Sequence, residues 1–301
     1  MPNINATNCD RITAAIQQML EGDVPAWRKP WRALRESGAA TMPRNAVTGH
    51  TYRGINTCIL WSRQDTDMRY LTYRQAAQHG GHVRKGEHGT QVCFWQKGRY
   101  TKRAESGEEE TRDGLLMRLY TVFHISQCED LQLPKASKVE PLPPPAGMDS
   151  LYRSLELRIE HGGDRACYIP SMDRVAMPRP EAFTTADAYS ATALHEITHW
   201  TGHESRLRRE FGKRFGDQAY AAEELVAEIG SAFLCAHLGI NSALEHHASY
   251  VHHWKKLLST DTRAVITAAS KAQAAADYVI AKIAPTEAPA EAMDLETAEA
   301  A

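Results

Sequence analysis

The sequence predicts an α+β fold, with a small, basic α+β part at the N-terminus and a mainly helical second part that contains a short strand region. Three observations lead to this prediction. Strand-like alternation and helical spacing both occur before residue 131, whereas apolar residues recur at helical spacing almost throughout from Asp187 onward. Between the two parts, residues 131–150 hold five prolines, which is typical of a semi-rigid linker.

This pattern divides the chain into four segments. We expect a first domain over 1–130, a proline-rich linker over 131–150 and a second domain over 151–284. The remaining segment, 285–301, is rich in Ala, Glu and Pro, and we expect a disordered tail because it has little apolar surface to bury. A length of 301 residues fits two domains.

The individual elements follow from periodicity and from turn-forming residues. In the first domain they are a helix over 11–20, a turn-rich loop with short strands over 45–56, a helix over 71–79 that Thr72 starts, and strands over 92–95 and 116–125 joined by a charged hairpin loop over 102–113. In the second domain they are a helix over 149–160, strands over 166–169 and 174–177, and helices over about 187–203, 219–238, 242–258 and 261–283.

The charge of the chain is distributed unevenly. The net charge of −2 argues at first against a nucleic-acid binder. Residues 11–103, however, contain 16 Lys and Arg and 6 Asp and Glu, a balance of +10, so the rest of the chain carries −12. A charged fraction of 24% with 43% hydrophobic residues excludes a mostly disordered chain.

The cysteines and the apolar runs indicate a cytoplasmic protein. Six cysteines are scattered without a C-x-x-C pair, so we expect reduced thiols rather than disulfides, a cysteine-rich zinc site or a zinc deaminase. No run approaches the roughly 18 apolar residues of a membrane span, and the first ten residues lack the apolar core of a signal peptide. We therefore expect no membrane partner.

An H-E-x-x-H motif stands at 195–199. On a helix, His195 and His199 share one face and can hold one Zn²⁺ ion per chain, with another divalent metal as the alternative. Glu196 lies beside them, where it can act as the base that takes a proton from the attacking water in amide hydrolysis. The competing interpretation is an exposed histidine pair that binds nothing.

A catalytic zinc site needs a third protein ligand and an open fourth position. Ser205 stands where one zincin class has a third histidine, so we look to the helix expected over 219–238. There, Glu224 and Glu228 share a face, and the small residues at 230–232 allow a close approach of two helices. We assign Glu224 as the third ligand and Glu228 as the acceptor of the outer N–H of a ligating histidine. The reverse assignment stays open.

The N-terminal part interleaves aromatic residues with cations, a pattern typical of single-stranded nucleic-acid binding, in which cations follow phosphates and aromatic rings stack on bases. The candidate DNA-binding residues are Trp27, Arg28, Lys29, Trp31, Arg32, Tyr52, Arg53, Tyr73, Arg74, Arg84 and Lys85. Trp27 and Trp31 are equally well explained as core anchors, and any single cation as part of a solvated face. The balance of +10 over the region is harder to explain without an anionic partner.

Several longer stretches resemble a known family. PAWRKPW at 25–31, NAVTGHTYRGIN at 45–56, LTYRQA at 71–76 and GGHVRKGEHGTQV at 80–92 are similar to the N-terminal domain of ArdC-type antirestriction proteins and TraC-type conjugative primases. YSATALHEITHWTGHESRL at 189–207 and YAAEELVAEIGSAFL at 220–234 resemble the zincin-like metallopeptidase domain of the same family. The similarity covers about residues 10–283.

The resemblance implies an antirestriction protein that binds single-stranded DNA and protects incoming plasmid DNA during conjugation. It also implies a gluzincin-like zinc peptidase site similar to those of DNA–protein crosslink proteases, with a protein substrate. The strand expected over 174–177 is a candidate for binding an extended peptide by edge addition. Two alternatives stay open: a non-enzymatic DNA-binding shield whose metal site is structural or vestigial, and a peptidase whose basic half binds an acidic protein.

Overall fold

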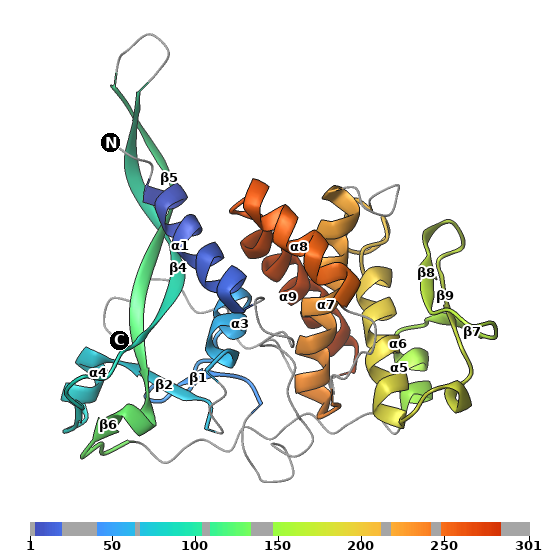
Figure 1. The fold of residues 1–301 in the computed structure, drawn as a ribbon, viewed down its shortest axis with the longest axis horizontal. Helices are drawn as coiled ribbons and strands as arrows, with labels where there is room; N and C mark the ends of the chain where they lie inside the picture. Colours follow the sequence, from blue (N-terminus) through green and yellow to red (C-terminus); the bar gives the residue numbers. More distant parts are fainter. Residues whose placement is uncertain are drawn as a thin grey trace.

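The computed structural model describes residues 4–19, 41–63, 67–103, 109–133, 147–211, 218–241 and 248–283. It confirms the α+β class, because strands prevail between residues 44 and 129 and helices prevail from residue 186 (Figure 1). The candidates Trp27, Arg28, Lys29, Trp31 and Arg32 lie outside the described residues, as do the expected tail and most of the proline-rich segment. None of the described helices is both long and apolar enough to cross a membrane.

The N-terminal part is built on a sheet with the strand order β1-β2-β5-β4. The strands are β1 (Arg44–Asn45), β2 (Arg69–Thr72), β4 (Thr90–Arg103) and β5 (Glu109–His124). A second pair of strands consists of β3 (His82–Val83) and β6 (Cys128–Glu129). The 3₁₀ turn η1 (Ile125–Gln127) directly precedes β6. The helices in the described residues of this part are α1 (Ile4–Met19), α3 (Ile55–Trp61) and α4 (Tyr73–Gln78).

The two helices that periodicity predicted in this part are present, with shifted ends. Helix α1 begins at Ile4 rather than near residue 11, and its buried residues Cys9, Ile12 and Ile16 recur at helical spacing. Helix α4 begins after Thr72, as predicted. The Thr72 hydroxyl accepts from the Gln75 amide, and the Gln75 side chain accepts from the Thr72 amide, so the two residues form a capping box.

Strands β4 and β5 form one long hairpin, which corrects the charged loop expected over 102–113. Only 104–108 lie between the two strands, and the ladder continues to the pair Arg103↔Glu109. Opposite charges face each other across it: Arg99 Nε lies 3.1 Å from Asp113 Oδ1. Pairs of opposite charges across two strands stabilise a hairpin that has few apolar residues. The charged composition of this segment is therefore compatible with strands, although it predicted a loop.

Apolar residues from both sides of the proline-rich segment form one hydrophobic core. The Trp61 ring on α3 packs edge-on against Phe233, with the ring centroids 5.6 Å apart. The hydroxyl of Thr13 on α1 donates to the backbone oxygen of Thr262, at 2.5 Å. The N-terminal helices therefore pack directly on the C-terminal ones. The boundary at 131–150 stays a prediction, because most of it lies outside the described residues.

The C-terminal part begins with helix α5 (Met148–Ser154) and a small sheet of order β7-β9-β8. Its strands are β7 (Arg158–His161), β8 (Cys167–Ile169) and β9 (Arg174–Met177). The 3₁₀ turn η2 (Pro170–Met172) joins β8 to β9, and the 3₁₀ turn η3 (Pro180–Ala182) follows β9. The helix expected over 149–160 is thus too long. Glu156 adopts a left-handed φ of 53°, and the chain then pairs with β9 as a parallel strand. Pairing with a distant strand outweighs the local helical pattern.

Among the described residues, four helices follow: α6 (Ala186–Trp200), α7 (Gln218–Leu238), α8 (Ala248–Thr260) and α9 (Ala264–Ile283). Helices α6 and α7 approach closely at Gly230, as the small residues at 230–232 predicted. A Cβ at this position would lie 2.6 Å from Cγ2 of Thr198, closer than atoms can pack. This glycine therefore determines how near α7 comes to the helix that carries the H-E-x-x-H motif.

Gly230→Ala is expected to destabilise the protein by about 1–3 kcal/mol, because the added methyl group overpacks the α6–α7 contact. On an open helix surface the same change would stabilise by about 1 kcal/mol. Urea unfolding of Gly230→Ala, Thr198→Ala and the double variant measures the effect. We expect the double variant to recover part of the loss, and a Gly230→Ala protein as stable as the wild type would contradict the close approach.

Candidate functional site

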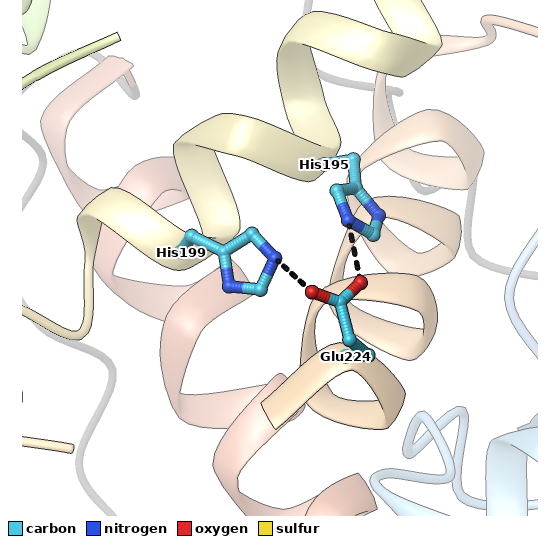
Figure 2. A group of neighbouring side chains, drawn as sticks. All are labelled: His195, His199 and Glu224. Atoms are coloured by element: carbon cyan, nitrogen blue, oxygen red, sulfur yellow. Dashed lines mark ion pairs between the residues drawn. The ribbon is translucent and has the colours of Figure 1, made fainter. Parts of the chain in front are cut away.

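Helix α6 carries both histidines of the motif on one face. The helix starts at a Thr185 cap, whose hydroxyl accepts from the Ala188 amide at 3.0 Å. One turn separates His195 from His199, and their ring centroids lie 4.9 Å apart. Helix α7 places Glu224 against this face, so that its carboxylate points between the two rings (Figure 2).

Glu224 contacts each histidine with a different oxygen. Its Oε2 lies 3.5 Å from Nε2 of His195, and its Oε1 lies 3.6 Å from Nε2 of His199. These distances are longer than an ordinary N–H···O bond of about 2.7–3.2 Å. They are close to the roughly 3.4 Å that separates neighbouring ligands of a tetrahedral zinc with bonds of about 2.0–2.1 Å. One atom from each residue lies within 4.8 Å of the others, so the group can hold a metal ion.

The charges at this group depend on one another. Burial disfavours a charged His195, but the carboxylates of Glu224, Glu196 and Glu228 outweigh it and raise the pKa of His195 to about 9. Burial likewise disfavours a charged Glu224, yet the two histidines lower the pKa of its carboxyl to about 2. The site therefore favours positive charge between its carboxylates, which is the electrostatic condition for binding a cation.

A buried carboxylate supports the outer side of His199. Glu223 Oε1 lies 3.2 Å from His199 Nδ1, the ring nitrogen that faces away from Glu224. Arg209 in turn holds Glu223, with Nη2 donating to Oε1 at 2.9 Å and Nε to Oε2 at 3.1 Å. Arg209 also donates to Thr201 Oγ1 and to the Thr198 backbone oxygen. A carboxylate behind a histidine fixes the ring's orientation and tautomer, which prepares the opposite nitrogen for a metal.

Glu223, not Glu228, is therefore the carboxylate that contacts a histidine's outer nitrogen, which corrects the role expected of Glu228. Glu228 is buried and acts on His195 through its charge. Its oxygens do not belong to the group of ligand atoms that His195, His199 and Glu224 form. The assignment of Glu224 as third ligand agrees with this geometry and stays a prediction.

Strand β8 holds the side chain of Glu196. The backbone N–H of Tyr168 donates to Glu196 Oε2 at 2.7 Å, so the carboxylate of the expected base is fixed beside the histidines. β8 is also an edge of its sheet, whereas β9 lies in the centre between β7 and β8. The peptide-binding edge expected at 174–177 is therefore wrong. Neighbouring strands already occupy both sides of β9, and the strand next to the site is β8.

A salt bridge fastens this small sheet to the end of α6. Arg206 pairs with Asp173, which follows the turn after β8, and Tyr168 Oη donates to Asp173 Oδ1 at 2.9 Å. The Arg206 guanidinium lies 3.9 Å from the centroid of Trp200, and its Nε donates to the Trp200 backbone oxygen at 2.7 Å. The contacts of Arg206 with Asp173 and Trp200 thus connect the small sheet to α6 and keep β8 next to Glu196.

The candidate DNA-binding residues within the described part of the chain lie in different environments. Tyr52 is 7% exposed and packs edge-on against Tyr70 in a second core cluster, so it cannot stack on a base, which corrects its expected role. Burial also raises its pKa to about 12. Arg53 forms an ion pair with Asp277 on α9 and so joins the two parts of the molecule.

The remaining four candidates lie at the surface of the N-terminal part. Tyr73 is 63% exposed at the start of α4, and Arg74 follows it on the same helix. Arg84 pairs with Glu87 at 2.6 Å, whereas Lys85 is exposed in the turn at Gly86. The contact of these four residues with DNA stays a prediction.

Three residues near the metal-binding group were missed by sequence reasoning: Glu223, Arg209 and Tyr168. Glu223 is adjacent to Glu224, but adjacency on a helix does not reveal which histidine nitrogen it meets. Arg209 and Tyr168 come from a loop and a strand outside the two helices, and no spacing rule joins them to the motif. Only the packing of these segments brings them together.

The family models match two successive regions of the chain. Residues 5–123 match the N-terminal domain of anti-restriction factor ArdC, and residues 146–271 match a zincin-like metallopeptidase. The second region contains His195, Glu196, His199 and Glu224, and the first contains the basic, aromatic segments.

Known proteins are similar to this chain over most of its length. The protein y4eC of Sinorhizobium fredii (strain NBRC 101917 / NGR234) is 36% identical, with 91% of each chain covered. DNA primase TraC of Escherichia coli is 37% identical over 88% of this chain, which spans only 19% of the primase. A second TraC primase of the same species is 36% identical, and the chain spans 26% of it.

Two crystal structures share the fold. Antirestriction protein ArdC of plasmid R388 is similar in its metal-free form with a TM-score of 0.72 and 36% identity, over 91% of this chain and 97% of that one. Its Mn(II)-bound form is similar with a TM-score of 0.72 and 35% identity, over 93% of this chain and 99% of that one. Since both domain models match in order and a relative is aligned almost end to end, this chain belongs to the family of ArdC antirestriction proteins.

Proposed function

We propose that this protein binds single-stranded DNA with its N-terminal part and protects incoming plasmid DNA from restriction during conjugation. We further propose that its C-terminal part is a zinc-dependent peptidase site that acts on a protein. The observation that supports the second proposal most strongly is the convergence of His195, His199 and Glu224, with Glu196 held beside them. The Mn(II)-bound form of the R388 protein supports a divalent metal in the family.

The donor set fits zinc in kind and number. Two imidazole nitrogens and one carboxylate are typical ligands of catalytic zinc, and they leave a fourth position for substrate or water. His195, His199 and Glu224 would hold the ion, and Glu223 with Arg209 would orient His199 behind it. When bound, the metal supplies Lewis acidity for hydrolysis of an amide.

Glu196 provides the proton transfer. Its Oε2 accepts from the Tyr168 amide, so Oε1 is the atom that takes a proton from the attacking water. The same oxygen then delivers this proton to the leaving amine nitrogen. Because β8 is an edge strand beside Glu196, an extended peptide lying along it would present its carbonyl groups near this carboxylate.

The support for single-stranded DNA comes from charge and from family membership. Residues 11–103 carry a balance of +10, and the matched ArdC region covers all of them. Such a density of cations is costly to hold together unless an anion neutralises it. The alternative is a shield that binds DNA and does not use its metal site for chemistry, and the Glu196 variant described below distinguishes the two.

Glu224→Gln is expected to weaken divalent-metal binding by about 100-fold or more, because an amide oxygen replaces a charged ligand. Glu228→Gln is the matched control, one turn further along α7, and should change the affinity less than tenfold. Isothermal titration of the metal-free protein with Zn²⁺ or Mn²⁺ provides the comparison. A larger loss in the Glu228 variant would reverse the ligand assignment.

Glu196→Gln is expected to bind metal and DNA like the wild type and to lose peptide-bond hydrolysis by about 100-fold or more, because an amide cannot accept the proton. Two assays are made on the variant: cleavage of a DNA-bound protein, and protection of transferred DNA from a restriction enzyme. Loss of both activities would show that antirestriction needs the chemistry. Full protection without cleavage would favour the shield.

The affinity for a single-stranded oligonucleotide is expected to fall about tenfold or more between 50 and 200 mM salt, since each neutralised phosphate releases counterions. Fluorescence anisotropy at several salt concentrations gives the slope, and polyglutamate of similar charge serves as the control ligand. Weak salt dependence, or equal affinity for polyglutamate, would indicate an acidic protein partner instead.

A further inference from the structure

The β4–β5 hairpin has two different faces, since residues directly opposite in the ladder share a face. On one face lie Cys93 and Met117, which are buried, and the Asn8 side chain of α1 donates to the Met117 backbone oxygen at 2.8 Å. The other face carries Phe94 opposite Arg118 and Tyr120 opposite Val92. Figure 1 shows the hairpin projecting beyond the helical part, with α1 beside it.

Where the structure describes the side chains of β4 and β5, two large aromatic residues remain exposed on this second face. Phe94 and Tyr120 are each 39% exposed, and their ring centroids lie 5.5 Å apart at an interplanar angle of 82°. Below them, Tyr52 contacts Phe94 at 6.5 Å and Tyr70 at 6.4 Å. The exposed pair is thus the outer end of a row of four rings that starts in the core. Packing from below holds the rings in place, which lowers the entropy lost when a ligand binds.

Two arginines lie on or next to this face, and Glu87 is near enough to Arg63 for their charges to interact. Arg118 is exposed directly opposite Phe94, and Nη1 of Arg63 reaches Thr90 Oγ1, on the same face, at 3.3 Å. Within the residues of β4 and β5 whose side chains the structure describes, the acidic one is Asp113, which lies on the opposite face and pairs with Arg99. Arg118 thus shares a ladder pair with Phe94, and Arg63 contacts Thr90, the next residue of β4 on this face beyond Val92, which pairs with Tyr120.

We propose that Phe94, Tyr120, Arg118 and Arg63, together called the aromatic face, form a stacking surface for unpaired bases of single-stranded nucleic acid. The inference rests on the proposed DNA binding and names the surface that performs it. Exposed rings stack on unpaired bases of any sequence, and flanking arginines contact the phosphates between them. A duplex keeps its bases stacked on each other and cannot use the rings in this way.

The aromatic face also explains why Tyr52 is buried. Its ring supports Phe94 from below instead of contacting a base itself. Of the four residues, none was singled out by the sequence, because alternate residues of β4 and β5 point to opposite faces and only the register shows which aromatic residues share one.

Phe94→Leu and Tyr120→Leu test the proposal in the full-length chain. Each is expected to weaken binding of a labelled oligothymidylate by about tenfold, since the ring is lost while an apolar side chain remains. Trp95→Leu is the matched control. Trp95 is the next residue of the same strand and is equally exposed, at 39%, but it lies on the opposite face. It should bind within about twofold of the wild type.

Phe94→Tyr and Tyr120→Phe keep the rings and should bind like the wild type even if the leucine variants fold poorly. Arg118→Gln should reduce the slope of log affinity against log salt concentration by about 1, the change expected when one phosphate contact is lost. Fluorescence anisotropy provides both measurements, with a duplex of the same length beside the single strand.

The outcomes separate the two proposals. If the wild-type protein does not bind the oligonucleotide, the proposed DNA binding itself fails. If the wild type binds and the leucine variants bind equally well, or if Trp95→Leu loses as much as they do, the aromatic face is overturned while DNA binding stands. An equal loss for duplex and single strand would also overturn base stacking.

Discussion

The close packing of α6 on α7 is the constraint on which the candidate metal centre depends. His195 and His199 share a helix face by spacing alone, but two imidazoles do not make a catalytic metal site without a third ligand. Gly230 lets α7 approach until Thr198 leaves no room for a Cβ, and this distance brings Glu224 to 3.5 and 3.6 Å from the histidines. A wider spacing would leave two exposed histidines and a separate carboxylate.

Buried charge is tolerated at this contact because each charged group has a partner. An isolated carboxylate or guanidinium in the core would cost several kcal/mol. Glu223 meets both His199 and Arg209, and Arg209 also donates to Thr201 and to the backbone of Thr198. The same hydrogen bonds that offset the cost of burial also orient the histidine. Stability and the geometry of the site therefore depend on one network.

The two parts of the molecule are joined by more than a linker. Their apolar residues form one core, in which Trp61 contacts Phe233, and at the surface Arg53 pairs with Asp277. Tyr52, a residue that sequence reasoning assigned to DNA binding, is buried and supports Phe94 instead, whereas the contact of Arg53 with DNA stays a prediction. The aromatic face lies on the side of the β4–β5 hairpin opposite Cys93 and Met117, and Phe94 and Tyr120 stay exposed there.

Local spacing and composition were enough to predict the α+β class, the capping of α4 at Thr72 and the placement of His195 and His199 on one helix face. They also indicated Glu224 and the close approach at 230–232, since both follow from helical periodicity. The remaining features depend on how the elements pack. Tertiary packing ended α5 early so that β7 could pair with β9, placed Glu223 rather than Glu228 behind a histidine, and brought Arg209 and Tyr168 to the site. These contacts join residues far apart in the chain, and the packing energy and strand register that select them are properties of the folded molecule, not of any local pattern.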